Sequence, residues 1–448
     1  MFQRNALLAL GEWKKKLNRK PLIIRGARQV GKTTLVNEFG KEFDTYLHIN
    51  LEKTSDNELF VKNDAVEDVL TAIYLLLNKS KQPGSVLLFI DEIQNSPRAV
   101  SLLRYFYEEL SHIYVIAAGS LLESLMDRQI SFPVGRVEYF ALRPCSFSEF
   151  LGALGETELQ RALVTISLPA SIHGRMMKLF NEFVLVGGMP EAISFYAQTK
   201  DMVSLNDIYE TLLTGYRDDT EKYAINSNSE QVLRLVLTYG WQYAGQRIKY
   251  EKFANSRYKS REMGEAMRTL EKALLLELSY PTTATTLPIQ PDLKKSPKLL
   301  WLDTGLVNYA AGLQKDLFGI NDISGSWKGK IAEHIVGQEL LSISTKVIEK
   351  RYFWVREAKN SQAEIDFLYQ YKGLLIPIEV KSGNSSNLKS LHSFMEVSSQ
   401  QIAIRFWNNP VTLDSVKLPS GKTYTLYNLP FYYAGQMDRF LWNRQVGD

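Results

Sequence analysis

The sequence predicts an α/β protein: a doubly wound parallel sheet at the N-terminus, then a helical region, then a second α/β domain. Two segments carry the first part of this prediction. Residues 21–34, PLIIRGARQVGKTT, form an apolar, strand-like run that leads directly into the pattern GxxxxGKT. Residues 86–92, VLLFIDE, form a second apolar run that ends in two acidic residues. A strand, loop and helix of this kind, followed by an acidic strand end, predict a nucleoside triphosphate site.

The phosphate loop is expected to bind ATP and Mg²⁺. Gly26 and Gly31 permit a compact loop whose backbone N–H groups converge on phosphate oxygens, at the positive end of the following helix. Lys32 is expected to reach the β- and γ-phosphates. Thr33 supplies a hydroxyl to Mg²⁺, and Thr34 completes the nucleotide-binding set. The alternative is a glycine-rich turn without a ligand, which the strand and helix beside the loop disfavour.

Three further polar residues follow apolar runs. Asp91 ends a run that is typical of a buried parallel strand, and is expected to hold Mg²⁺ directly or through water. Glu92 is placed to orient or deprotonate the attacking water. Ser120 follows the run YVIAAG and is expected near the γ-phosphate. It either senses the phosphate or caps the helix that begins at LLESLMDR, and both roles are compatible.

Strand and helix signals alternate along this part of the chain. Residues 45–51 and 114–118 predict further strands, and residues 66–77 predict an amphipathic helix. Such alternation predicts a parallel sheet covered on both faces, with the ligand at the carboxyl ends of its strands. We assign residues 1–150 to this P-loop domain.

Composition places the chain among globular proteins with several domains. Its 448 residues exceed what one core usually organises, so about two to four domains are expected. The single cysteine, Cys145, excludes an internal disulfide framework, which fits the reducing cytoplasm where we expect the protein. No run approaches the roughly 18 apolar residues of a membrane span, so no membrane partner is expected. The net charge of +4 argues neither for nor against nucleic acid.

Further motifs extend the pattern. They are AAGSLL at 117–122, Gly135 followed by Arg136, RPCSFSEFL at 143–151 and VGGMPEAI at 186–193. With the phosphate loop and LLFIDEIQ, they resemble the AAA-type ATPases that carry a C-terminal DUF4143 domain, which are relatives of the archaeal-type ATPases. The resemblance implies that Arg136 contacts the nucleotide as an arginine finger or sensor, in cis or from a neighbouring subunit of a homo-oligomer. The alternative is a structural arginine that pairs with a carboxylate at the sheet edge.

Helical periodicity replaces the strand signals in residues 151–310. Helices are predicted at residues 180–196 (two helices separated by the VGGMP turn), 207–217, 231–240, 247–261 and 263–278. The first of these suggest a small helical lid. The last three, followed by apolar and polar alternation through residue 302, have the order of a winged helix–turn–helix. In the segment LWLDTGL at residues 300–306, Asp303 is expected to serve as a cap or turn residue.

The segment 247–261 is rich in basic residues. They are Arg247, Lys249, Lys252, Arg257, Lys259 and Arg261. Such residues can contact the phosphates of nucleic acid. Charge runs are more often solvated faces, however, and winged helices often bind proteins instead. Nucleic acid is therefore one of two kinds of partner expected for this region.

A second chemical constellation lies near the C-terminus. Asp366 sits in a segment of alternating acidic and apolar residues, and Glu379 and Lys381 share one face of the run LLIPIEVKSG. A hairpin brings them together, and an amphipathic helix predicted at 328–340 adds Glu333. This order resembles the PD-(D/E)xK nuclease fold of the restriction endonucleases. The resemblance implies that Asp366 and Glu379 are catalytic and hold Mg²⁺ with Glu333, while Lys381, also catalytic, positions water or stabilises the phosphorane charge.

The alternative for this constellation is a solvent-facing hairpin with cross-strand ion pairs and no metal. Two functions of the whole chain follow. In the first, the ATPase domain is coupled to a metal-dependent nuclease in residues 311–448, which acts on nucleic acid. In the second, ATP operates a switch or scaffold, and the nuclease-like domain is an inactive interaction module.

Overall fold

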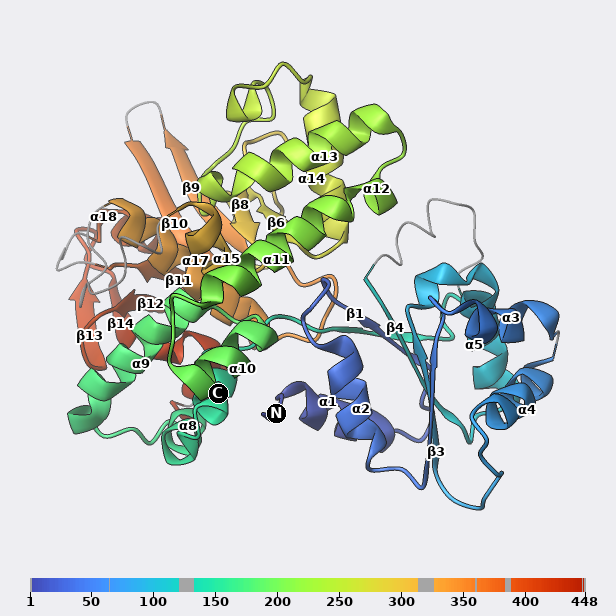
Figure 1. The fold of residues 1–448 in the computed structure, drawn as a ribbon. Helices are drawn as coiled ribbons and strands as arrows, with labels where there is room; N and C mark the ends of the chain where they lie inside the picture. Colours follow the sequence, from blue (N-terminus) through green and yellow to red (C-terminus); the bar gives the residue numbers. More distant parts are fainter. Residues whose placement is uncertain are drawn as a thin grey trace.

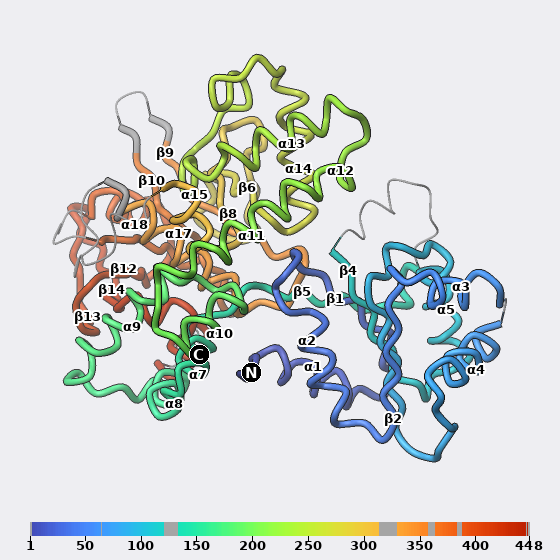
Figure 2. Tube along the Cα trace, viewed as in Figure 1, coloured from blue at the N-terminus to red at the C-terminus, as the bar shows by residue number. Residues whose placement is uncertain are grey.

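The computed structural model describes residues 2–63, 65–120, 133–312, 326–358, 361–382, 388–444 and 446. In Figure 1 the N-terminal sheet with α2 to α5 lies to the right, and the green, yellow and red elements form a second mass on the left. Figure 2 shows α1 and β5 between the two masses in this view.

The N-terminal domain is a doubly wound parallel sheet, as predicted. Its strands are β1 (Leu22–Arg25), β2 (Thr45–Asn50), β3 (Val86–Asp91), β4 (Tyr114–Gly119) and β5 (Glu138–Ala141). They lie in the order β2-β3-β4-β1-β5, and all neighbouring strands are parallel. Because β4 separates β1 from β3, the phosphate loop and the acidic end of β3 flank the end of β4.

Helices cover both faces of this sheet. They are α1 (Ala6–Lys14), α2 (Lys32–Gly40), α3 (Thr54–Lys62), α4 (Val66–Leu76) and α5 (Pro97–Glu109). Alternate residues of β3 face opposite cores: Leu87 and Phe89 pack with α1 and α2, while Leu88 and Ile90 pack with α3 to α5. A strand buried on both faces reads as an unbroken apolar run, which is why residues 86–90 contain no polar side chain.

The middle region is mainly helical, as predicted. Its helices are α7 (Phe147–Ala153), α8 (Thr157–Val164), α9 (His173–Val186), α10 (Pro190–Thr199), α11 (Leu205–Asp218), α12 (Thr220–Tyr223), α13 (Ser227–Tyr239), α14 (Ser260–Lys272) and α15 (Thr304–Ala310). Between α14 and α15, β6 (Leu276–Ser279) and β8 (Lys298–Trp301) form an antiparallel pair. Asp303 caps α15 by accepting from the Leu306 N–H, as its expected cap role requires.

The helix predicted at 247–261 is wrong. This segment holds only a short 3₁₀ turn at Phe253–Asn255, and α14 begins at Ser260. Lys252, Ala254 and Asn255 have left-handed φ values between 50° and 57°, which no α-helix accommodates. Phe253 is buried against Tyr243, so tertiary packing fixes an irregular path here and overrides the local propensity. The helix predicted at 263–278 likewise divides into α14 and β6.

The C-terminal region is a mixed sheet with helices. The elements are α17 (Ser326–Ser342), β9 (Tyr352–Ala358), β10 (Ser361–Tyr371), β11 (Leu374–Val380), α18 (Lys389–Val397), β12 (Ile402–Trp407), β13 (Thr412–Lys417), β14 (Thr423–Pro430) and α19 (Met437–Asn443). The strand order is β13-β14-β12-β11-β10-β9-β7, where β7 (Pro281–Thr282) comes from the middle region. The predicted hairpin is β10 and β11, which are antiparallel.

One apolar core runs through all three regions. It includes Leu10 of α1, Phe147 of α7, Trp301 of β8 and Phe367 of β10. Trp241 and Trp301 stack within it, with ring centroids 3.8 Å apart. A second core lies behind the N-terminal sheet, and a third lies between the C-terminal sheet and α18. Ala27 and Val30 of the phosphate loop belong to the first core, so the loop packs on the same core as the middle and C-terminal regions. None of the described helices is both long and apolar enough to cross a membrane.

Candidate functional site

The phosphate loop joins β1 to α2 and has the conformation that its glycines permit. Gly31 has φ of 90°, in the left-handed region, and immediately precedes α2. A Cβ atom at Gly26 would lie 2.6 Å from the carbonyl oxygen of Leu142, so only glycine fits there. Thr34 lies in the first turn of α2 and is exposed. The loop thus presents a helix N-terminus, which is suited to an anion.

Lys32 is folded back onto this loop. Its Nζ donates to the carbonyl oxygens of Gly26 at 2.9 Å and Ala27 at 2.8 Å, and the side chain is buried. Burial lowers the pKa of Lys32 to about 8, against the raising effect of Glu92 and Asp91. An incoming phosphate provides a full negative charge for this ammonium in place of two neutral carbonyls. The chemistry of the loop therefore fits a polyphosphate.

Thr33 and Asp91 form the oxygen pair expected for Mg²⁺. The Thr33 hydroxyl donates to Asp91 Oδ2 at 2.7 Å, across the gap between α2 and the end of β3. Hydroxyl and carboxylate oxygens together are the donor set that Mg²⁺ takes beside nucleotide phosphates. His48 of β2, which the sequence argument did not single out, places its Nε2 3.8 Å from Asp91 Oδ2. That nitrogen has no hydrogen-bond partner among the described residues.

Glu92 has a strained backbone. It follows β3 with φ of 53° and ψ of 44°, a left-handed conformation that is uncommon for a glutamate. Its own N–H donates to Asp91 Oδ1 at 3.0 Å, and the Gln94 amide donates to its carboxylate. Strain of this kind is concentrated at functional sites. The Glu92 carboxylate lies close enough to Lys32 to raise the pKa of that lysine, so it belongs to the surroundings of the phosphate loop.

Ser120 and Arg136 occupy different surroundings. Ser120 directly follows β4, between the phosphate loop and the Asp91 strand, and is buried. The helix that it was expected to cap lies outside the described residues. Arg136 is 42% exposed and its Nε pairs with Glu108 Oε1 of α5 at 2.7 Å. The alternative prediction for Arg136 was a structural pairing with a carboxylate at the sheet edge. Arg136 does pair with a carboxylate, but that carboxylate lies on a helix and not at the sheet edge.

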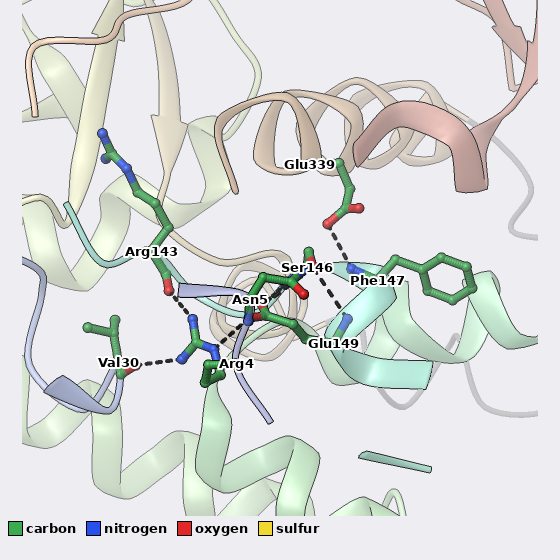
Figure 3. A network of polar contacts seen from close by, with 8 residues as sticks. All are labelled: Arg4, Asn5, Val30, Arg143, Ser146, Phe147, Glu149 and Glu339. Carbon is green, nitrogen blue, oxygen red and sulfur yellow. Dashed lines mark hydrogen bonds and ion pairs between the residues drawn. The ribbon is translucent and has the colours of Figure 1, made fainter. Parts of the chain in front are cut away.

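Arg4 ties the phosphate loop to the middle region. Its guanidinium donates to the carbonyls of Val30 at 3.0 Å and Arg143 at 2.8 Å, and to Glu149 Oε1 at 2.9 Å (Figure 3). Glu149 also belongs to the capping box of α7 with Ser146. The Arg4 side chain, 11% exposed, thus connects the N-terminal segment, the loop and α7.

The same network reaches the C-terminal region. Glu339 of α17 accepts from the backbone N–H of Phe147, the first residue of α7, at 3.0 Å (Figure 3). Burial raises the pKa of Glu339 to about 8, against the lowering effect of this hydrogen bond. Polar contacts therefore run from the phosphate loop through Arg4 and α7 to α17.

A second link joins the loop to the end of α11. Arg28, inside the loop, donates to both carboxylate oxygens of Asp219 at 2.6 Å. The Tyr216 hydroxyl donates to the carbonyl oxygen of Arg28 at 3.0 Å. Asp219 is buried, so this ion pair is shielded from solvent on one side. Neither Arg4 nor Arg28 was singled out from the sequence, because their carboxylate partners, Glu149 and Asp219, lie more than a hundred residues away.

The structure brings the predicted C-terminal residues together. Glu333 comes from α17, Asp366 from β10, and Glu379 from β11, with Lys381 directly after it. Asp366 Oδ2 accepts from the Val380 N–H at 2.7 Å. Lys381 Nζ lies 2.5 Å from Glu379 Oε1, and Glu379 Oε2 is buried without a hydrogen-bond partner among the described residues.

Three further residues complete this cluster: Lys298, which was not predicted, and Glu364 and Arg247, which were not expected to join it. Lys298, the first residue of β8, lies 2.5 Å from Glu333 Oε1, 2.7 Å from Glu364 Oε1 and 3.9 Å from Asp366 Oδ1. Arg247 pairs with Glu364 Oε2 at 3.0 Å. The available signal was a lysine at the start of the buried run KLLW, where an isolated charge requires a partner.

Burial shapes the protonation of the cluster. It raises the pKa of Glu333 to about 8 and of Glu379 to about 7, partly offset by the neighbouring lysines. Burial also disfavours the charged form of Lys298, but Glu333, Asp366 and Glu364 outweigh it, so the pKa of Lys298 is raised. The ammonium is the stable form of this side chain.

The predicted magnesium site in this cluster does not fit the geometry. Among the residues that the structure describes, no three His, Cys, Asp or Glu side chains form a group that could hold a metal ion. The reason is visible at Lys298, whose ammonium lies among the carboxylates that a cation would need. We therefore derive no chemistry through a metal at this position.

Three family models match successive parts of the chain. Residues 18–151 match the AAA domain, residues 177–317 match a domain of unknown function called DUF8612, and residues 328–423 match another called DUF4143. The chain therefore has an AAA domain, a P-loop ATPase domain, at its N-terminus and a DUF4143 domain at its C-terminus. No curated protein sequence matches the chain.

Several solved structures are distantly similar. A Walker-type ATPase of Pyrococcus abyssi is 13% identical, with 69% of this chain and 96% of that chain covered, at a TM-score of 0.46. The Aeropyrum pernix ORC1 protein in complex with DNA is 12% identical, with 71% and 94% covered, at 0.27. C. elegans PCH-2 is 18% identical, with 44% and 61% covered, at 0.27. At such scores these likenesses do not indicate what this chain binds.

Proposed function

We propose that this chain, with its AAA and DUF4143 domains, binds and hydrolyses Mg²⁺-ATP and uses the nucleotide to change how its three regions pack. The observation that supports hydrolysis best is the Thr33–Asp91 hydrogen bond of 2.7 Å between the phosphate loop and the end of β3, with Glu92 next in sequence. This pair joins a hydroxyl and a carboxylate at the position that a nucleotide-bound cation needs.

Each residue has a definite task in this proposal. Lys32 and the loop N–H groups hold the phosphates, and Thr33 and Asp91 hold Mg²⁺, which neutralises phosphate charge when bound. Glu92 orients the attacking water and takes its proton. Ser120, at the end of the intervening strand, donates its hydroxyl to the γ-phosphate or to that water. Nothing in this scheme requires the C-terminal cluster.

The contacts of the loop supply a route for the switch. To reach a phosphate, Lys32 must leave the carbonyls of Gly26 and Ala27, so the loop has to adjust. The same loop is held by Arg4 at Val30 and by Asp219 at the Arg28 side chain. Nucleotide binding therefore acts on α7, through Arg4, and on the end of α11, through Asp219. Packed interfaces of this kind have two discrete arrangements and do not deform continuously, so nucleotide binding selects one packing of these regions over the other.

Replacing Lys32 by Ala is expected to weaken Mg²⁺-ATP binding by about 10- to 100-fold, because hydrogen bonds to charged groups contribute roughly 1.5–3 kcal/mol. Calorimetric titration of the folded protein measures the affinity directly. Lys41→Ala is the matched control, since Lys41 directly follows α2 but pairs with Glu38 at the surface. The proposal fails if the folded wild-type protein shows no ATP binding at all.

Replacing Asp219 by Asn is expected to loosen the end of α11 in the ATP-free protein. The ion pair, in which Arg28 Nη1 contacts both carboxylate oxygens, is reduced to a hydrogen bond from the guanidinium to a neutral amide oxygen, so amide exchange there should rise by about tenfold or more. Hydrogen exchange with and without ATP measures this effect. The neighbouring Asp218→Asn is the control, because Asp218 is exposed. Equal exchange in the two variants would show that Asp219 does not link the loop to α11.

A nuclease is the second candidate, supported by the convergence of Glu333, Asp366, Glu379 and Lys381 in the order of the PD-(D/E)xK fold. The basic segment 247–261 would then grip nucleic acid, although Arg247 and Arg261 already pair with carboxylates of this chain. Labelled DNA and RNA are incubated with the protein, Mg²⁺ or Mn²⁺, and with or without ATP. We expect no cleavage. Cleavage by the wild-type protein that Asp366→Ala abolishes would establish the nuclease.

A further inference from the structure

Lys298 is an ammonium surrounded by carboxylates. The residue is 3% exposed, and its Nζ contacts Glu333 and Glu364 and lies 3.9 Å from Asp366. The ring of Phe353 lies on another side, with its centroid 4.8 Å from Nζ. A buried lysine needs such compensation, because removing a charge from water without a partner is costly. The position is therefore built to hold one cation.

The charges around Lys298 show which cation would replace it. Four carboxylates gather here, namely Glu333, Glu364, Asp366 and Glu379. Their cationic partners among the described residues are Lys298, Lys381 and Arg247. With Lys298 included and all seven of these named groups counted as ionised, the sum is one excess negative charge. Without it, the excess is two, which is the charge that a divalent cation neutralises.

Glu379 provides an independent indication. It is buried at 3% exposure, and while Oε1 meets Lys381, Oε2 finds no partner among the described residues. Buried carboxylate oxygens are rarely left unpaired, so this oxygen is available to a further hydrogen-bond donor or a cation. Oxygen donors of this kind suit Mg²⁺ or Mn²⁺. Oxygen donors are present, but the ammonium of Lys298 lies among Glu333, Glu364 and Asp366.

Lys298 does not belong to the sheet that carries the carboxylates. It comes from β8, which pairs with β6 of the middle region, whereas Asp366 and Glu379 lie on β10 and β11. Stacking of Trp301 on Trp241 anchors β8 within that region. The ammonium of Lys298 thus comes from the middle region, which precedes the DUF4143 domain in the chain.

We propose that Lys298 is a built-in substitute for a divalent cation, and that it blocks a latent metal site formed by Glu333, Asp366 and Glu379. The cluster takes Mn²⁺ or Mg²⁺ only when this ammonium is removed. This inference goes beyond the proposed ATP switch and does not depend on ATP binding. It agrees with the finding that, among the described residues, no three His, Cys, Asp or Glu side chains form a metal-binding group.

The test is a Mn²⁺ titration of the nucleotide-free protein, in which electron paramagnetic resonance measures free Mn²⁺. Lys298→Met is expected to gain about one Mn²⁺ site per chain, which Lys298→Met combined with Asp366→Asn should lose. Asn at position 366 can still accept from the Val380 N–H, so the hairpin contact is kept. Dependence on Asp366 separates this site from the phosphate loop.

The matched control is Lys350→Met. Lys350 loses the same charge but pairs with Glu271, outside the cluster, so no Mn²⁺ site should appear. The proposal is overturned if the wild-type protein already binds Mn²⁺ in an Asp366-dependent way, or if folded Lys298→Met gains no site. Lys298→Gln, which keeps a polar end, replaces Lys298→Met should the latter not fold. ATP turnover, measured in parallel, reports separately on the proposed ATPase.

Discussion

Replacing Glu92 by Gln is expected to reduce ATP turnover by about 100-fold or more, while ATP binding persists, because a positioned general base contributes roughly 10²- to 10⁴-fold. Glutamine keeps the size and hydrogen-bonding reach of the side chain but cannot accept the proton of water. The Thr33–Asp91 pair and Lys32 remain in place, so the affinity should change little. Phosphate release gives the turnover, and calorimetry gives the affinity.

The control for this variant is Glu58→Gln. Glu58 lies on α3 of the same domain, where it pairs with Lys62 at the surface, so both turnover and affinity should match the wild-type protein. Unchanged turnover in Glu92→Gln would assign the base to another group. His48 is then the next residue to test, because its Nε2 lies beside Asp91 and lacks a partner among the described residues.

Local spacing explains what could be predicted of the nucleotide site. Gly26, Gly31 and Lys32 act within a single loop, and their roles follow from steric and electrostatic requirements of that loop. Asp91 follows from the end of an apolar run. The orientation of Glu92 could not be predicted, because a left-handed glutamate leaves no trace in periodicity. His48 was missed because its neighbour Asp91 comes from the adjacent strand of the sheet.

In the C-terminal cluster, too, local spacing predicts some residues, while another reaches the cluster from a different part of the fold. Asp366, Glu379 and Lys381 belong to one hairpin, so strand alternation alone predicts their convergence. Lys298 reaches the cluster from another sheet, and no local pattern connects it to Glu333 or Asp366. Without Lys298 the carboxylates suggest a metal site. With Lys298 they form a nearly compensated ionic cluster, so one residue changes the chemical interpretation of the others.

Replacing Arg4 by Met is expected to lower the free energy of unfolding by about 3–5 kcal/mol, because removing one partner of a buried ion pair leaves the other charge uncompensated. Arg4 is 11% and Glu149 5% exposed in this pair. Methionine fills much of the volume but leaves Glu149 without its guanidinium, and the carbonyls of Val30 and Arg143 without a donor. Urea denaturation followed by circular dichroism measures the change.

Arg161→Met separates this effect from the general loss of an arginine. Arg161 is 72% exposed and pairs with Glu158 on the surface of α8, where such a pair contributes at most about 1 kcal/mol. A comparably small loss in Arg4→Met would mean that the apolar core alone holds the loop against α7. The alternative outcome is a large loss of unfolding free energy in Arg4→Met, together with a smaller stabilisation by ATP than in the wild-type protein. That outcome would show that Arg4 links nucleotide binding to the packing of the loop against α7. The phosphate loop would then sense its ligand and transmit that event through the same carbonyl, Val30, that Arg4 now holds.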